Sequence, residues 1–238
     1  MTSERHPPRL AATAAAFAVL AAVASISAPS PAAAAGYVPG PCISNAGPGP
    51  HPFVDVAGGA FYADAVAWMF SNGITRGVTP DRFGPDRPVT RAEFAAMLHR
   101  MACEPVAAGV AAFADLVPGA FYRAAVDWMV GENITMGKTA TSFGPDDPMT
   151  RGELATFLYR FVDEPTGAPG AGFVANDPAS FHAAAVDWLV FRSITRGTSA
   201  ITFSPGRTIT RGEVATFLHR LNTIGDVALV LRPVLTGL

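Results

Sequence analysis

A short segment that occurs three times, 60 residues apart each time, limits the possible folds of this chain more than any other feature. The copies span 89–94, 149–154 and 209–214, and each reads apolar, Thr, Arg, Ala or Gly, Glu, apolar. A threonine followed three residues later by a glutamate is the capping box of a helix N-terminus, and the flanking apolar pair forms a hydrophobic staple. The sequence therefore predicts three equivalent helices, one beginning in each copy.

The recurrence extends upstream of each copy and defines a repeat of two helices. In the first repeat, the spacing of Tyr62, Ala65, Val66 and Met69 gives one apolar face of a helix, which we expect over 61–72. A loop then leads to the capped second helix. One such pair has too small a core to be stable alone, whereas three pairs together can bury one. The predicted fold is all-α, with three helix-loop-helix repeats.

Composition at the two ends of the chain sets the remaining boundaries. A basic start, an apolar run over 10–26 and small residues ending at Ala35 are typical of a secretory signal. We therefore expect export, with no transmembrane span after signal cleavage. The formal net charge of −2 gives no basic stripe for nucleic acid. The expected segments are a signal peptide (1–35), a Pro/Gly-rich extended arm (36–52), three repeats (53–103, 113–163 and 173–223) and an apolar tail that packs against the repeats (224–238).

The arginine in each copy stands at the first helical position, where a cation faces the positive end of the helix dipole. The cost is about 0.3–1 kcal/mol at an exposed site, so its use at Arg91, Arg151 and Arg211 indicates another role. Free amides of the first helical turn and a guanidinium would together form an anion cradle. In that case, replacing an arginine with glutamine leaves stability unchanged. In the alternative, each arginine pairs with a nearby acid or packs its stem on an aromatic ring.

The remaining reactive residues predict a disulfide but no catalytic or metal site. Cys42 and Cys103 both lie in the exported part, and a bond between them would close a loop worth roughly 4 kcal/mol in the chain-entropy model. The equivalent positions His99, Tyr159 and His219 do not form a metal-ligand pattern. The glutamates are explained by the capping box, so we expect no enzyme, metal or cofactor. A small wall hydrolase is the least favoured alternative. Three tryptophans on the first helices are interpreted as core (Trp68, Trp128 and Trp188).

Several motifs together resemble the S-layer homology domain, and the resemblance covers all three repeats. They are Phe53-x-Asp55-Val56, Phe61-Tyr62-x-x-Ala65-Val66, Gly73-Ile74-x-x-Gly77, Phe83-x-Pro85 and Thr90-Arg91-Ala92-Glu93-Phe94. The resemblance implies a pseudo-threefold arrangement in which one helix of each repeat builds a central three-helix bundle. It also implies grooves between the repeats that hold an anionic secondary cell-wall polysaccharide, often a pyruvylated one.

The same resemblance implies a set of ligand-binding residues. They are the motif arginines (Arg91, Arg151, Arg211), the early aspartates (Asp55, Asp115), the aromatic residues at the start of the first helices (Phe61, Phe121, Phe181) and the loop glycines (Gly77, Gly137, Gly197). Two features depart from the family pattern. Phenylalanine replaces the usual tryptophan in every copy, and Ala175 stands where the third aspartate belongs. We therefore expect the ligand site of Arg211 to be the weakest of the three.

The expected function is non-covalent attachment of an exported protein to the bacterial cell wall, through polysaccharide binding at the cell surface. The alternative is a protein-interaction or envelope-assembly module that has this fold but binds no glycan. Its partners would then be other envelope proteins.

Overall fold

The computed structural model describes residues 43–44, 47–174 and 177–224, which all belong to a compact unit spanning 33–238. The predicted signal peptide, Cys42, Ala175 and residues 225–238 of the tail lie outside the described residues. Six helices are present among them, with isolated backbone bridges and no named strand, which confirms the all-α prediction. The helices are α1 (Ala63–Ser71), α2 (Arg91–Met101), α3 (Arg123–Gly131), α4 (Arg151–Phe161), α5 (Ala183–Phe191) and α6 (Arg211–Thr223).

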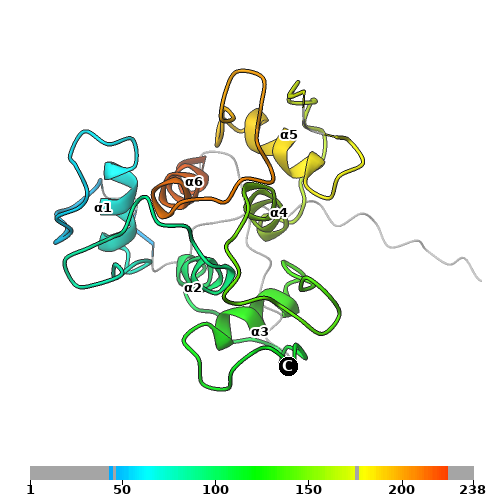
Figure 1. Ribbon diagram of the computed structural model, residues 1–238, viewed down its shortest axis with the longest axis horizontal. Coiled ribbons are helices and arrows are strands. Elements are labelled where there is room, and N and C mark those ends of the chain that lie inside the picture. The colour runs from blue at the N-terminus through cyan, green and yellow to red at the C-terminus, as the bar shows by residue number, and fades with distance from the viewer. Residues whose placement is uncertain (1–42, 45–46, 175–176, 225–238) are drawn as a thin grey trace, which may run out of the picture. The chain divides into compact units, whose positions relative to one another are not determined.

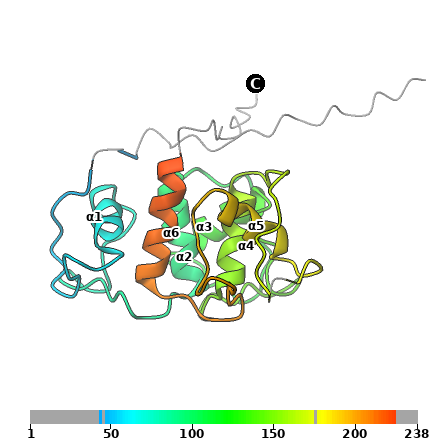
Figure 2. The same cartoon turned by 90° about the horizontal axis from the view of Figure 1, so that it is seen from above.

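The second helices of the three repeats occupy the centre of the unit, and the first helices surround them (Figure 1). Helix α1 packs on α6, α3 on α2 and α5 on α4. Each outer helix therefore packs on the central helix of a different repeat, in cyclic order. The repeats interlock as a closed ring, and no repeat buries its own two helices against each other. The turned view shows the central helices α2, α4 and α6 alongside one another (Figure 2).

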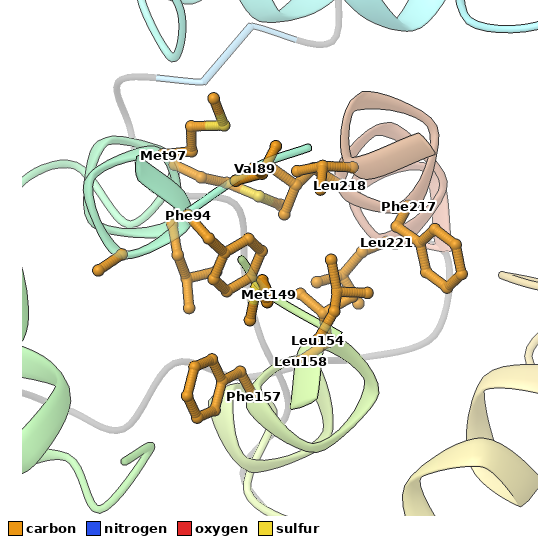
Figure 3. Packing of buried hydrophobic residues seen from close by; sticks show 14 of the residues in the cluster. Val89, Phe94, Met97, Met149, Leu154, Phe157, Leu158, Phe217, Leu218 and Leu221 are labelled. Carbon is orange, nitrogen blue, oxygen red and sulfur yellow. The ribbon is translucent and has the colours of Figure 1, made fainter. Parts of the chain in front are cut away.

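The core between the central helices is built from their apolar stripes. Phe94 from α2, Leu154 and Leu158 from α4 and Leu218 from α6 are fully buried, and their side chains point toward one another (Figure 3). Burying an apolar side chain of this size stabilises the fold by about 1.5–3 kcal/mol relative to leaving it exposed. This arrangement is the predicted central three-helix bundle.

The N-termini of the central helices have the predicted caps. Thr90, Thr150 and Thr210 each accept a hydrogen bond from the amide of the glutamate three residues on, which in turn accepts from the threonine amide. One such cap contributes about 1 kcal/mol. The staple residues that flank these caps are all fully buried, as predicted from their apolar character (Val89, Phe94, Met149, Leu154, Ile209 and Val214).

A ring of three backbone hydrogen bonds joins these helix starts. The amide of Met149 donates to the carbonyl of Val89 at 2.8 Å, and Val89 donates to Ile209 at 3.1 Å. Ile209 donates to Met149 at 2.9 Å, which closes the ring. Since each repeat contributes one donor and one acceptor, the three central helices begin at the same end of the unit.

The outer helices are held by aromatic contacts to the neighbouring repeat. Trp68 packs on His219 with ring centroids 5.2 Å apart, and Trp128 packs on His99 at 5.3 Å. The interpretation of all three tryptophans as core is confirmed, because they are 2–5% exposed. The arm differs from prediction at one point, since Ile43 is buried in the core cluster and is not simply extended. Within the part of the chain that the structure describes, no helix is long and apolar enough to cross a bilayer.

Candidate ligand-binding grooves

The motif arginines are buried where two repeats meet. Arg91 is 2% exposed. Its Nε donates to the carbonyl of Phe143 at 2.8 Å, and its Nη1 donates to Oε1 of Glu153 at 2.7 Å. The guanidinium carbon lies 4.7 Å from the centroid of the Phe143 ring, within range of a cation–π interaction. Both acceptors and this ring belong to the following repeat, so Arg91 links repeats 1 and 2.

The other two arginines form the same kind of link. Arg151 donates to the carbonyl of Phe203 at 2.9 Å and to Glu213 at 3.3 Å. Arg211 donates to the carbonyl of Phe83 at 2.8 Å, which closes the cycle from repeat 3 to repeat 1. Burial lowers the pKa of Arg151 and Arg211 to about 10, against the attraction of the neighbouring glutamates. Both side chains therefore remain charged at neutral pH.

The amides of the first helical turn are not free, which corrects the expectation of an anion cradle. The amide of Arg91 donates to the carbonyl of Asp147 at 3.0 Å, and the next amide, of Ala92, donates to Pro145 at 3.0 Å. The third amide, of Glu93, donates to the capping threonine. The same three bonds occur in α4 and α6. The loop of a neighbouring repeat, with the threonine cap, therefore fills the place that an anion would need.

Two grooves with equivalent linings lie between the repeats, with volumes of about 460 Å³ and about 360 Å³. We call them groove A and groove B. Groove A is lined by Thr75, Arg76, Gly77, Val78, Arg87, Glu93, Ala96, Met97, Arg100, Phe121 and Arg211. Groove B is lined by Arg91, Thr135, Met136, Gly137, Lys138, Glu153, Thr156, Phe157, Arg160 and Phe181.

Each groove combines residues from all three repeats. In groove A, most of the wall comes from repeat 1, whereas Phe121 comes from repeat 2 and Arg211 from repeat 3. In groove B, repeat 2 supplies most of the wall, with Phe181 from repeat 3 and Arg91 from repeat 1. The sequence-predicted arginine, glycine and phenylalanine therefore do meet in one place, but each comes from a different repeat.

The phenylalanines and a set of basic side chains give the grooves their chemical character. Phe121 and Phe181 are 65% and 67% exposed, so each ring presents most of its surface at a groove. Arg76 and Arg100 line groove A, and Lys138 and Arg160 line groove B. The buried motif arginines reach the groove walls with guanidinium groups that already have several partners.

The predicted aspartates do not line groove A or groove B and act through a loop. The carboxylate of Asp55 accepts hydrogen bonds from the amides of Phe83 and Gly84, both at 2.8 Å. Burial raises the pKa of Asp55, but these hydrogen bonds outweigh it and the pKa is lowered overall. Asp115 holds Phe143 and Gly144 in the same way. Because the carbonyls of these phenylalanines accept the motif arginines, the aspartates support the arginine sites indirectly.

The third repeat is different at this loop. Ala175 lies outside the described residues, and Ser204 stands where the other repeats have Gly84 and Gly144. Ser204 has a positive φ of 56°, and its hydroxyl is 2.7 Å from that of Thr198. Arg151 is the arginine that contacts this loop. The loop of the repeat that lacks the aspartate is therefore contacted by Arg151 and not by Arg211. The ranking of the three ligand sites stays a prediction.

Two of the predicted glycines, Gly77 and Gly137, line the grooves, and the backbone itself requires a glycine at all three positions. Gly77 and Gly137 have φ of 83° and 79°. A Cβ on Gly137 would lie 2.4 Å from the Phe113 ring and 2.6 Å from the carbonyl oxygen of Thr139. Gly197 has φ of 83° and is equally crowded. Their occurrence in the motif is explained by the fold, whether or not they contact a ligand.

Sequence reasoning missed several groove residues. Arg100 and Arg160 recur at the same place in the repeat, but their position near a helix C-terminus already gave a sufficient structural explanation. Each also donates to the end of the neighbouring loop, at Ile74 and Ile134. Lys138 occurs in one copy only, and no sequence pattern pointed to it.

Cys103 is disulfide-bonded. Cys42, the only other cysteine of the sequence, lies outside the described residues. The pairing of Cys42 with Cys103 stays a prediction.

An interlocked ring of helical repeats with grooves at the repeat contacts defines a repeat-built binding module. The sequence matches the model of the S-layer homology domain at residues 52–95, 112–155 and 174–215, which together cover more than half of the chain. The chain belongs to the S-layer homology domain family.

Proteins of bacterial surfaces are similar to this chain. It is 25% identical to an S-layer protein of Bacillus thuringiensis subsp. finitimus over 71% of this chain and 21% of the relative. It is 29% identical to a cell surface protein of Thermoanaerobacter kivui over 46% of this chain and 15% of the relative. It is also 29% identical to a surface-layer 125 kDa protein of Lysinibacillus sphaericus over 49% of this chain and 10% of the relative. The chain thus spans about a fifth or less of the length of these relatives.

The family and these relatives indicate a structural protein of the cell surface or cell wall, with attachment to the wall as its general role. S-layer homology domains bind cell-wall polysaccharide in general.

Proposed function

We propose that the chain attaches to the cell wall by binding an anionic secondary cell-wall polysaccharide in grooves A and B. The observation that carries this proposal is the meeting of an exposed phenylalanine with basic side chains in two equivalent grooves. The rings of Phe121 and Phe181 offer flat apolar surfaces against which the C–H face of a sugar can pack. Phe121 lies edge-on to the adjoining Tyr122, and Phe181 lies edge-on to the adjoining His182.

The cations give the grooves their preference for an anionic polymer. Arg76 and Arg100 in groove A, and Lys138 and Arg160 in groove B, lie within reach of solvent. A guanidinium presents its N–H groups in a fork that matches a carboxylate, so a polymer bearing carboxylates, such as pyruvylated sugars, fits this lining. Glu93 and Glu153 oppose an anion, but each is engaged by an arginine (Arg87 and Arg91).

The wall-binding experiment uses purified cell walls with and without removal of the non-peptidoglycan polymer. We expect the protein to sediment with intact walls and to remain in solution with stripped ones. A Phe121→Ala, Phe181→Ala double variant should lose about 10-fold or more in affinity, since each ring covers apolar surface worth on the order of 1.5 kcal/mol. Phe191→Ala is the matched control, because Phe191 is 57% exposed and outside both linings.

A charge series completes the test. Arg76→Gln and Lys138→Gln should each weaken wall binding, and the effect should shrink at high salt because partly exposed charges are screened. Equal binding to intact and stripped walls, with the phenylalanine variants unchanged, would instead favour a protein-interaction or envelope-assembly module without glycan binding.

The proposed role includes no catalytic step. The glutamates that could act as general acids complete capping boxes, and each accepts a hydrogen bond from an arginine. Incubation of the purified protein with peptidoglycan should release no soluble fragments, and turnover there would contradict this part of the proposal.

A further inference from the structure

The ends of α5 and α6 in the third repeat carry a cluster of arginines that the other two repeats do not have. Arg192, Arg196 and Arg220 line one cavity of about 280 Å³, together with Ser193, Thr223 and Ile224. We call this cavity the arginine pocket. Its volume is several times the roughly 30 Å³ that one water molecule occupies in the liquid.

The equivalent positions of the other repeats are much less basic. Where the third repeat has Arg192, the first has Asn72 and the second has Glu132. Where it has Ile224, they have Glu104 and Glu164. Those two glutamates lie 3.9 Å from Arg100 and 3.4 Å from Arg160, whereas the third repeat has replaced the carboxylate with an apolar side chain.

The repeat fold itself does not require this charge. Arg220 is explained by its position in the last turn of α6 and by its hydrogen bond to the carbonyl of Ile194 at 3.0 Å. Arg196 is replaced by Met136 in the second repeat, which folds in the same way. Arg192 has two guanidinium nitrogens, Nε and Nη2, that are shielded from solvent and have no hydrogen-bond partner among the described residues. A buried N–H without a partner costs about 1–3 kcal/mol, so an occupant of the pocket toward which this guanidinium can turn is favoured.

The arginine pocket is separate from the proposed polysaccharide grooves. Arg196 and Arg220 are the equivalents of Arg76 and Arg100, so the pocket adjoins the position of a third groove. Its other walls come from the ends of α5 and α6, and the equivalents of those walls (Asn72, Gly73, Cys103, Glu104, Glu132, Asn133, Asp163 and Glu164) do not line groove A or groove B.

We propose that the arginine pocket binds a phosphate group, either free phosphate or the phosphate of an anionic wall polymer. The described lining residues include three guanidinium groups and no carboxylate. Their many N–H donors are matched better by the several acceptor oxygens of a phosphate group than by the two oxygens of a single carboxylate. The hydroxyls of Ser193 and Thr223 add neutral donors to the same lining.

The experiment measures the melting temperature of the purified protein as inorganic phosphate is titrated against chloride at constant ionic strength. At ten times the dissociation constant, a single phosphate should raise the melting temperature by about 3–6 °C. Glycerophosphoglycerol is titrated in parallel, because a response to this diester identifies the phosphate of a polymer backbone and a response to inorganic phosphate alone identifies free phosphate or a monoester.

Two variants use side chains that other repeats already carry at these positions. Arg192→Asn removes the unpartnered guanidinium, and Ile224→Glu restores the carboxylate of Glu104 and Glu164. Both should abolish the phosphate-dependent shift, and Ile224→Glu should also melt higher than the unaltered protein without phosphate. Arg82→Gln, at an exposed arginine far along the chain from the pocket, should keep the full shift.

The proposal is overturned if the unaltered protein shows no shift, or if Arg192→Asn or Ile224→Glu keeps it. These outcomes are independent of the wall pull-down, because Phe121, Phe181 and the groove cations are left intact.

Discussion

Nη1 of Arg91 and Oε1 of Glu153 lie 2.7 Å apart, although 62 residues separate them in the chain. Glu153 also completes the capping box at Thr150, so one carboxylate serves the start of α4 and the contact with repeat 1. This pair explains why a cation recurs at an unfavourable helix position. The guanidinium does not stay at its own helix end but reaches the carbonyl and carboxylate of the next repeat.

Replacing Arg91 with glutamine should therefore destabilise the protein. Removing one partner of a buried pair costs about 3–5 kcal/mol, and the partial exposure of Glu153 reduces this to about 2–4 kcal/mol. The melting temperature should fall by about 5–10 °C, measured by calorimetry. This reverses the sequence-based expectation of unchanged stability.

Arg82→Gln is the control for the removal of an arginine, since Arg82 is exposed and should shift the melting temperature by less than about 2 °C. If Arg91→Gln melted like this control and yet lost wall binding, the arginine would serve the ligand and not the contact between repeats.

Asp115→Asn should weaken the loop that presents the Phe143 carbonyl to Arg91. Its carboxylate accepts bonds from Phe143 and Gly144 at 2.9 and 2.7 Å, and because the site is partly exposed we expect a loss of about 1 kcal/mol at neutral pH. Burial raises the pKa of Asp115, but the hydrogen bonds to its carboxylate lower the pKa by more, so that overall it lies below the usual value of 3.8. The carboxylate therefore contributes stability above about pH 3.8, and loses it as the pH falls through the folded-state pKa.

Urea unfolding at pH 7 and at pH 3 measures this contribution. The difference between Asp115→Asn and the unaltered protein should be smaller at pH 3. Asp146→Asn, at an exposed aspartate of the same loop, should cost little at either pH. An Asp115 variant as stable as this control would mean that the loop holds its shape without the carboxylate.

Features set by neighbouring residues were predictable from the sequence. The capping boxes, the staples and the apolar stripes depend on residues within one or two turns, and the structure has them where expected. The residues that follow the outer helices are left-handed, with φ of 69° at Gly73 and 58° at Asn133, and glycine and asparagine are the residue types that adopt this conformation most readily. Local sequence patterns predict these elements correctly because the residues that form each pattern also make the interactions that stabilise the element.

The cyclic exchange between repeats could not be predicted in this way. Identical motifs fit a helix pair that packs within its own repeat as well as one that packs on its neighbour. The side chain of Arg91 bonds the carbonyl of Phe143, which is 52 residues away in the sequence. Phe121 and Arg211 line the same groove only because the ring of three repeats closes. Sequence reasoning therefore identified the arginine, glycine and phenylalanine of each groove but not which repeats supply them to the same groove.

Gly137→Ala should be strongly destabilising. The residue has φ of 79°, where a side chain is strained, and the new Cβ would lie within 2.4 Å of the Phe113 ring. Strain and displacement of the ring together should cost about 2–4 kcal/mol. The measurement is the free energy of unfolding in urea.

Gly131→Ala is the matched control for this variant. Gly131 ends α3, has open space around its Cα, and should become more stable by up to about 1 kcal/mol because alanine favours the helix. Similar effects of the two substitutions would show that the crowding at Gly137 is relieved at little cost.

His219→Tyr should remove part of the acid sensitivity of the protein. His219 packs on Trp68, and burial lowers its pKa below 6.5; Asp64 raises the pKa and Arg220 lowers it further. The neutral ring is therefore favoured by folding, and its contribution is fully present above about pH 6.5. As the pH falls toward the folded-state pKa, the unfolded chain binds the proton more readily and stability is lost.

The chain itself provides the model for this substitution, because Tyr159 occupies the equivalent position and packs on Trp188 with ring centroids 6.0 Å apart. Melting temperatures measured from pH 8 to pH 5 should coincide for the two proteins near pH 8 and diverge below pH 6.5, with the tyrosine variant more stable. The unaltered protein and the variant should both keep the contribution of His182, whose pKa is also lowered by burial. Parallel curves over the whole range would show that the contact between Trp68 and His219 accepts the charged ring at no cost.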